Sequence, residues 1–148
     1  MLKKINPQEA HKILQQENGA LLIDVRSSIE YSFVGHPLNA INIPIKEPPN
    51  WNVQLRFIEQ VRESLVADVV DNNQSGDVPL LVLCRSGQRS ALAGEILIEG
   101  GFTNVFNVLN GFEGDKNKNF VPDSDEIGVK TLKGDGDFRS QECIELLK

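Results

Sequence analysis

Hydrophobic and polar residues along the chain follow two patterns, one of which has the period of a helix. Before residue 111 this period predicts helices at residues 7–18, 51–70 and 90–99. A short helix at residues 28–33 is predicted from Ser27 or Ser28 as its cap and from Glu30 early in it. Asn6 is a suitable cap for the first helix, and Pro7 occupies its first position, where a missing N–H does no harm. The Gly100-Gly101 pair is expected to end the last of these helices.

The second pattern consists of short apolar runs without clean alternation, at residues 21–26, 40–44, 79–84 and 104–108. Such runs are typical of strands that are buried on both faces. Strands and helices follow each other in turn, and parallel neighbours need a crossover connection. The order therefore predicts an α/β fold in which a parallel sheet is flanked by helices on both faces.

The length of 148 residues is that of one domain, and we expect a single domain over residues 1–148. Residues 111–140 depart from the pattern, because Gly, Asp, Asn and Lys dominate there and apolar residues are isolated. This composition predicts an irregular extension. A last amphipathic helix that contains Cys143 and Ile144 is expected to follow it.

The charge balance narrows the choice of partners. Twenty-one acidic and fifteen basic residues give a net charge of −6, which disfavours binding to nucleic acid or to an anionic membrane surface. Any anion that the protein binds would need a local cluster of positive charge. No apolar run approaches the ~20 residues of a membrane helix, and the first residues lack the apolar stretch of a signal peptide. We therefore expect a cytoplasmic protein.

The reactive side chains are few. The chain has two cysteines, Cys84 and Cys143, and two histidines, His11 and His36. Two cysteines cannot form a disulfide framework, which agrees with a reducing compartment. Because these four residues lack the spacing of a metal site, no metal is expected.

The segment from Cys84 to Ser90 carries the most chemical information. It ends an apolar run and opens a predicted helix, which places it at the carboxyl edge of the sheet, where α/β proteins bind ligands. Gly87 allows successive backbone N–H groups to point inward, and Arg85 and Arg89 add positive charge. Cys84 is either a reactive thiolate or the last buried residue of a core strand. The glycine and the arginines favour the reactive thiolate.

Several motifs accompany this segment in a fixed order. They are Leu22-Ile23-Asp24-Val25-Arg26, Glu30-Tyr31, Gly35-His36, Asn39-Ala40-Ile41-Asn42-Ile43-Pro44, Cys84-Arg85-Ser86-Gly87-Gln88-Arg89-Ser90, Gly101-Phe102 and Val105 to Gly111. In order and spacing they resemble the rhodanese-like domain family, in particular its bacterial single-domain type. The resemblance covers about residues 6–114 and leaves 115–148 as the irregular extension and C-terminal helix. The family commonly has a Trp soon after Gly111, where this chain has Phe112-Glu113-Gly114-Asp115.

The resemblance implies a sulfurtransferase without metal or organic cofactor. Cys84 falls on the family's nucleophile, which accepts a sulfane sulfur from an anionic donor such as thiosulfate and passes it to cyanide or a thiol. Asp24 and Arg26 fall on a pair beside the loop, which either supports the shape of the loop or is an exposed ion pair at a strand end. The substrate cradle would be formed by Arg85, Ser86, Gly87, Gln88, Arg89 and Ser90.

The sequence leaves alternatives open. A non-catalytic rhodanese-like module would carry sulfur or bind a partner, and it would form no thiocyanate from thiosulfate and cyanide. A cysteine-dependent phosphatase is disfavoured, because related phosphatase loops have one residue more than this chain has between Cys84 and Arg89. Cys143 is either a resolving thiol or a packed helix residue. His36, at a turn before Pro37, is expected to be structural rather than a general base, and His11 to be solvated.

Overall fold

The computed structural model describes residues 1–16, 19–69 and 77–112 of the chain. Within these residues five parallel strands form one sheet in the order β1-β7-β6-β2-β3. The strands are β1 (Lys3–Ile5), β2 (Leu21–Asp24), β3 (Ile41–Asn42), β6 (Leu80–Leu83) and β7 (Val105–Val108). A separate antiparallel pair is formed by β4 (Lys46–Glu47) and β5 (Asn52–Val53).

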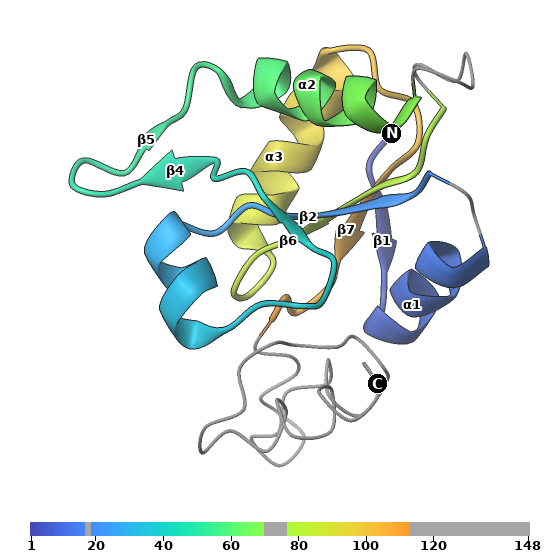
Figure 1. The fold of residues 1–148 in the computed structure, drawn as a ribbon, viewed down its shortest axis with the longest axis horizontal. Coiled ribbons are helices and arrows are strands. Elements are labelled where there is room, and N and C mark those ends of the chain that lie inside the picture. Colours follow the sequence, from blue (N-terminus) through green and yellow to red (C-terminus); the bar gives the residue numbers. More distant parts are fainter. Residues whose placement is uncertain (17–18, 70–76, 113–148) are drawn as a thin grey trace.

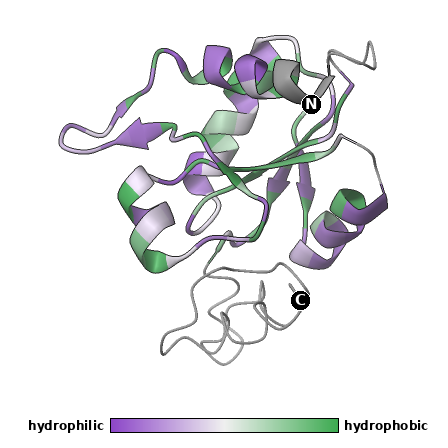
Figure 2. Ribbon diagram, in the orientation of Figure 1, coloured by the Kyte–Doolittle hydropathy of each residue, from purple (hydrophilic) through white to green (hydrophobic). Residues whose placement is uncertain are grey.

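Helices cover both faces of the five-stranded sheet (Figure 1). On one face lie α1 (Pro7–Gln16) and the short π-type helix η1 (Glu30–Val34), and on the other lie α2 (Phe57–Val69) and α3 (Gln88–Glu99). The central strands β2 and β6 are mainly apolar, whereas the helices combine apolar and polar positions (Figure 2). The expected fold class is confirmed. The predicted irregular extension and last helix lie outside the described residues.

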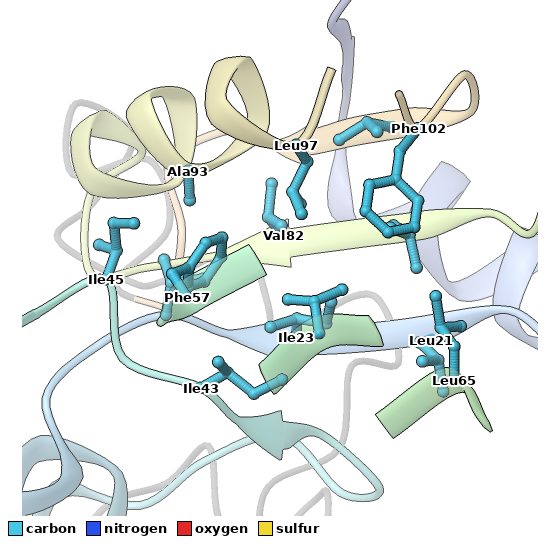
Figure 3. Close-up of a cluster of buried hydrophobic side chains, with 14 of the residues drawn as sticks. Leu21, Ile23, Ile43, Ile45, Phe57, Leu65, Val82, Ala93, Leu97 and Phe102 are labelled. Atoms are coloured by element: carbon cyan, nitrogen blue, oxygen red, sulfur yellow. The ribbon is translucent and has the colours of Figure 1, made fainter. Parts of the chain in front are cut away.

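Side chains of the central strands alternate between two hydrophobic cores. Ile23 and Val82 belong to the core beneath α2 and α3, which Figure 3 shows in close-up. Their chain neighbours Leu22 and Leu81 belong to the core on the face of α1. Because both faces of each strand are buried, the strands appear in the sequence as continuous apolar runs.

The helix ends confirm the sequence signals for capping. At the start of α1, the Glu9 N–H donates to Asn6 Oδ1 at 2.8 Å, and the Asn6 N–H donates to Glu9 Oε1 at 3.2 Å. α3 ends at Glu99, directly before the glycine pair that was expected to stop it. It begins at Gln88, slightly before the predicted residue.

The predicted helix over residues 51–70 is wrong in its first part, because α2 begins only at Phe57. The preceding residues belong to a turn and to β5. Their backbone is bonded to another segment, since the Gln54 N–H donates to the Ile45 carbonyl at 2.8 Å. Leu55, which matched the helical period, is 98% exposed, so apolar spacing alone extended the prediction too far.

Short strands form both edges of the sheet. The predicted strand over residues 40–44 is reduced to β3, and β1 was not predicted because it contains two lysines and one apolar residue. β1 nevertheless pairs with β7, with Lys3 opposite Phe106 and Ile5 opposite Val108. The Lys3 ammonium lies 4.9 Å from the centroid of the Phe106 ring.

Candidate active site

Cys84 directly follows β6 and precedes the N-terminal end of α3, where the sequence placed it. Its side chain is only 1% exposed, so it is also a buried residue at the end of a core strand. Two polar contacts distinguish it from an ordinary core cysteine. The Gly87 N–H donates to Sγ at 3.0 Å, and Ser90 Oγ lies 3.3 Å from Sγ. The loop therefore directs a backbone dipole at the sulfur, and the first turn of α3 places the oxygen of a hydroxyl group beside it.

Gly87 makes the inward N–H possible. Its φ is +106°, in the left-handed region that favours glycine. Of the other predicted cradle residues, Arg89 is partly buried and Ser90 is buried beside the sulfur. The cradle also has an outer rim of exposed residues, formed by Arg85, Ser86 and Gln88.

Arg89 is held by a carboxylate. Its two terminal nitrogens donate to the two oxygens of Glu30, each at 2.9 Å. Glu30 begins η1 and also accepts a hydrogen bond from Ser27 Oγ at 3.2 Å. The sequence analysis noted Glu30 as a motif residue and did not connect it with Arg89, because nothing in the sequence indicates that η1 folds over the start of α3.

The ion pair is stable at neutral pH. Burial alone would raise the pKa of Glu30, but the hydrogen bond and charge of Arg89 outweigh it, and the pKa lies below its ordinary value. The hydrogen bond to Glu30 likewise raises the pKa of Arg89 above its ordinary value, so both partners stay charged.

Asp24 and Arg26 form a buried ion pair, so their interpretation as an exposed pair is wrong. Their side chains are 0% and 1% exposed, and Arg26 Nη2 lies 2.6 Å from Asp24 Oδ2. Arg26 Nη2 also donates to the Gly35 carbonyl at 2.6 Å. Asp24 ends a strand that is covered on both faces, which is why the pair is inside the molecule. Each buried charge depends on its partner.

Phe112 connects this pair to the Cys84 loop. The Arg26 guanidinium lies 4.3 Å from the centroid of the Phe112 ring, and the Phe112 N–H donates to the Cys84 carbonyl at 2.7 Å. The neighbouring Gly111 has a φ of +58°, and a Cβ there would lie 2.2 Å from the Cys84 carbonyl oxygen. Glycine thus allows the chain after β7 to pass close to the Cys84 carbonyl, and Phe112 contacts both that carbonyl and Arg26.

His36 has a structural environment, as expected. Its ring stacks on that of Tyr31, with centroids 3.5 Å apart and planes at 7°. His36 Nδ1 lies 2.9 Å from the Tyr31 carbonyl oxygen, and the Tyr31 hydroxyl donates to the Ala40 carbonyl at 2.8 Å. His11 is partly exposed on α1.

Asn107, which the sequence analysis did not single out, also belongs to the site. It lies on β7, is 3% exposed, and accepts a hydrogen bond from Ser90 Oγ at 2.6 Å. The sequence does contain a signal for it. Alternate residues of a strand share a face, so Asn107 faces the same core as Val105, and an asparagine is unusual at such a position.

Over the described ranges, no group of three or more His, Cys, Asp or Glu side chains is placed to hold a metal ion. Nor is any helix in that part of the chain long and apolar enough to cross a membrane.

Known proteins resemble this chain over most of its length. A family model described as "Rhodanese-like domain" matches residues 6–118. A protein from Haemophilus influenzae, named thiosulfate sulfurtransferase GlpE, is 31% identical over 112 residues, which cover 76% of this chain and 86% of that protein. The uncharacterized protein RP600 from Rickettsia prowazekii is 31% identical over 117 residues, with 77% and 86% covered. The crystal structure of Rv0390 from M. tuberculosis superimposes with a TM-score of 0.69 at 27% identity, covering 89% of this chain and 98% of that one.

Proposed function

Because the chain belongs to the rhodanese-like domain family, as its motifs predicted, we propose that it is a sulfurtransferase that carries sulfur as a persulfide on Cys84. The relative named as a thiosulfate sulfurtransferase supports thiosulfate as the donor. The observation that carries the proposal is the hydrogen bond from the Gly87 N–H to Cys84 Sγ, at 3.0 Å, beside the N-terminal end of α3. A donor held in this position stabilises negative charge on sulfur without reorganisation of the loop.

The reaction has two steps. The Cys84 thiolate attacks the outer sulfur of thiosulfate, a bond forms between that sulfur and Sγ, and the bond to the sulfonate sulfur breaks, so that sulfite leaves with the electron pair. Cyanide or a thiolate acceptor then attacks the terminal sulfur of the persulfide. The persulfide bond breaks, and its electron pair returns to Cys84 as thiolate. The two steps balance without an oxidant or a reductant.

Arg89 is the proposed binding group for the sulfonate. Its bidentate bond to Glu30 fixes the guanidinium beside the loop, and a guanidinium has five N–H donors, so two bonds leave donors for an anion. Arg85 on the exposed rim would add positive charge along the approach. Asp24 and Arg26 are proposed as supporting residues that act through Phe112.

Arg89→Ala is expected to lower kcat/KM for thiosulfate about ten- to a hundredfold, because it removes a charge-assisted contact to the donor and leaves the Glu30 carboxylate unpaired beside it. Steady-state formation of thiocyanate measures the effect. The double variant Arg89→Ala, Glu30→Gln separates the two causes, since it should recover the part that is due to the unpaired carboxylate. Arg56→Ala is the matched control, because Arg56 is an exposed arginine on the surface. An unchanged kcat/KM in folded Arg89→Ala protein would exclude sulfonate binding by Arg89.

The proposed function is tested by the intact mass of the protein after incubation with thiosulfate. We expect a gain of one sulfur atom, which peptide mapping places on Cys84 and which cyanide removes as thiocyanate. A stable persulfide that gives no thiocyanate would favour the sulfur-carrying module over the enzyme. An unchanged mass together with no turnover would refute the proposed chemistry.

A further inference from the structure

The sulfur of Cys84 belongs to a closed ring of hydrogen bonds that also includes Gly87, Asn107 and Ser90. The Gly87 N–H donates to Sγ, and the Gly87 carbonyl accepts a hydrogen bond from Asn107 Nδ2 at 3.3 Å. Ser90 Oγ lies between Asn107 Oδ1, at 2.6 Å, and Cys84 Sγ, at 3.3 Å. The side chains of Cys84, Ser90 and Asn107 are all buried, so each polar group depends on the others.

The partners of Asn107 determine the direction of the Ser90 proton. A carbonyl oxygen accepts only, so the atom of the Asn107 amide that faces the Gly87 carbonyl must be the nitrogen. The amide oxygen then faces Ser90 and must receive the hydroxyl proton. A serine hydroxyl has a single proton, so Ser90 presents a lone pair to Cys84 Sγ. This arrangement suits a thiol that donates its S–H to Ser90, and it opposes a thiolate.

We propose that Asn107 is a positioning residue that holds the Ser90 hydroxyl proton away from Cys84 and thereby restrains formation of the thiolate. The thiol loses its proton to solvent on ionisation, and the hydroxyl must turn from Asn107 Oδ1 to the sulfur before it can stabilise the charge. Asn107 and the thiolate compete for one proton. Removing the amide of Asn107 therefore leaves Ser90 free to donate to the sulfur.

The charged groups around the sulfur remain the same in the experiment that tests this proposal. In the described part of the chain, the charged residues on β2 and its end, on η1, in the loop and in the first turn of α3 are Asp24, Arg26, Glu30, Arg85 and Arg89. None of them is altered in the variants below. A change between variants in the pH at which Cys84 becomes reactive therefore reports on Ser90 and Asn107.

The test is the rate at which iodoacetamide alkylates Cys84 as a function of pH, followed on the Cys84 peptide so that Cys143 does not contribute. Asn107→Leu, which keeps the shape and removes the amide, is expected to lower the midpoint by about one pH unit, because a hydroxyl then donates to the thiolate. Asn107→Val serves as a second variant with a residue that suits a strand. A midpoint that is unchanged or raised in the folded variants would overturn the proposal.

Whether Asn107 acts on Cys84 through Ser90 is tested by introducing Asn107→Leu into the Ser90→Ala variant. There the change from Asn107 to leucine should have no further effect on the midpoint, because no hydroxyl proton remains to be redirected. An equal shift in both backgrounds would mean that Asn107 acts through the Gly87 carbonyl, and it would refute the proposed role. Thermal unfolding of each variant confirms that a folded protein is compared.

This inference deepens the proposed function and rests on it for its relevance to sulfur transfer. Its test uses the protein without any sulfur donor, so a failure of the Asn107 proposal can be distinguished from a failure of the sulfurtransferase proposal. Absence of persulfide refutes the sulfurtransferase chemistry and leaves the alkylation result intact. The absence of an alkylation shift refutes the role of Asn107 and leaves the persulfide result intact.

Discussion

Cys84→Ser is expected to reduce thiocyanate formation roughly ten-thousandfold or more, because the serine hydroxyl is a far weaker nucleophile than a thiolate and forms no persulfide. The loop should keep its shape, since a serine oxygen can also accept the hydrogen bond from the Gly87 N–H. Turnover of thiosulfate and cyanide measures the effect, with circular dichroism as the check on folding. Undiminished turnover in this variant would end the sulfurtransferase proposal.

Cys143→Ser is the matched control, because it removes the other cysteine of the chain. Cys143 lies outside the described residues, and its two interpretations, as a resolving thiol and as a packed helix residue, predict different results. If the residue only packs, the variant keeps its turnover and the persulfide on Cys84 has an unchanged lifetime. A longer-lived persulfide in the variant would instead identify Cys143 as the resolving thiol.

Asp24→Asn is expected to lower the free energy of unfolding by about 3 to 5 kcal/mol, because it leaves the charge of Arg26 buried without a partner. Chemical denaturation measures the loss. The double variant Asp24→Asn, Arg26→Met should lose much less, since methionine removes the charge and can still pack on Phe112. A single variant as stable as the wild type would mean that the pair contributes nothing to the fold.

The parts of the fold that local signals encode could be predicted from the sequence. Asn6 and Glu9 lie three residues apart and bond to each other, so a short window contains the whole cap. The same holds for the strand, turn and helix around Cys84, where the apolar run, Gly87 and the next helical period follow one another along the chain. These signals sufficed to place Cys84 between β6 and α3, at the carboxyl end of a central strand.

The parts of the site that depend on distant contacts could not be predicted. Arg89 and Glu30 are separated by 59 residues, and Asn107 and Ser90 by 17. The residue type of Glu30 does not reveal that its carboxylate binds Arg89, because acidic residues are common early in helices. The ion pair of Asp24 and Arg26 shows the same limit, because only the complete fold reveals that both charges are buried.

The two edges of the sheet have a consequence for how the protein behaves at high concentration. An edge strand offers unpaired N–H and C=O groups to other chains, and a long apolar edge therefore promotes aggregation. Here one edge, β3, has two residues, and the other, β1, has three, of which Lys3 and Lys4 are charged. Lysine on a short edge strand repels a second copy before backbone pairing can extend. The apolar central strands, which would aggregate readily if exposed, are thus enclosed between edges that discourage intermolecular β-sheet growth.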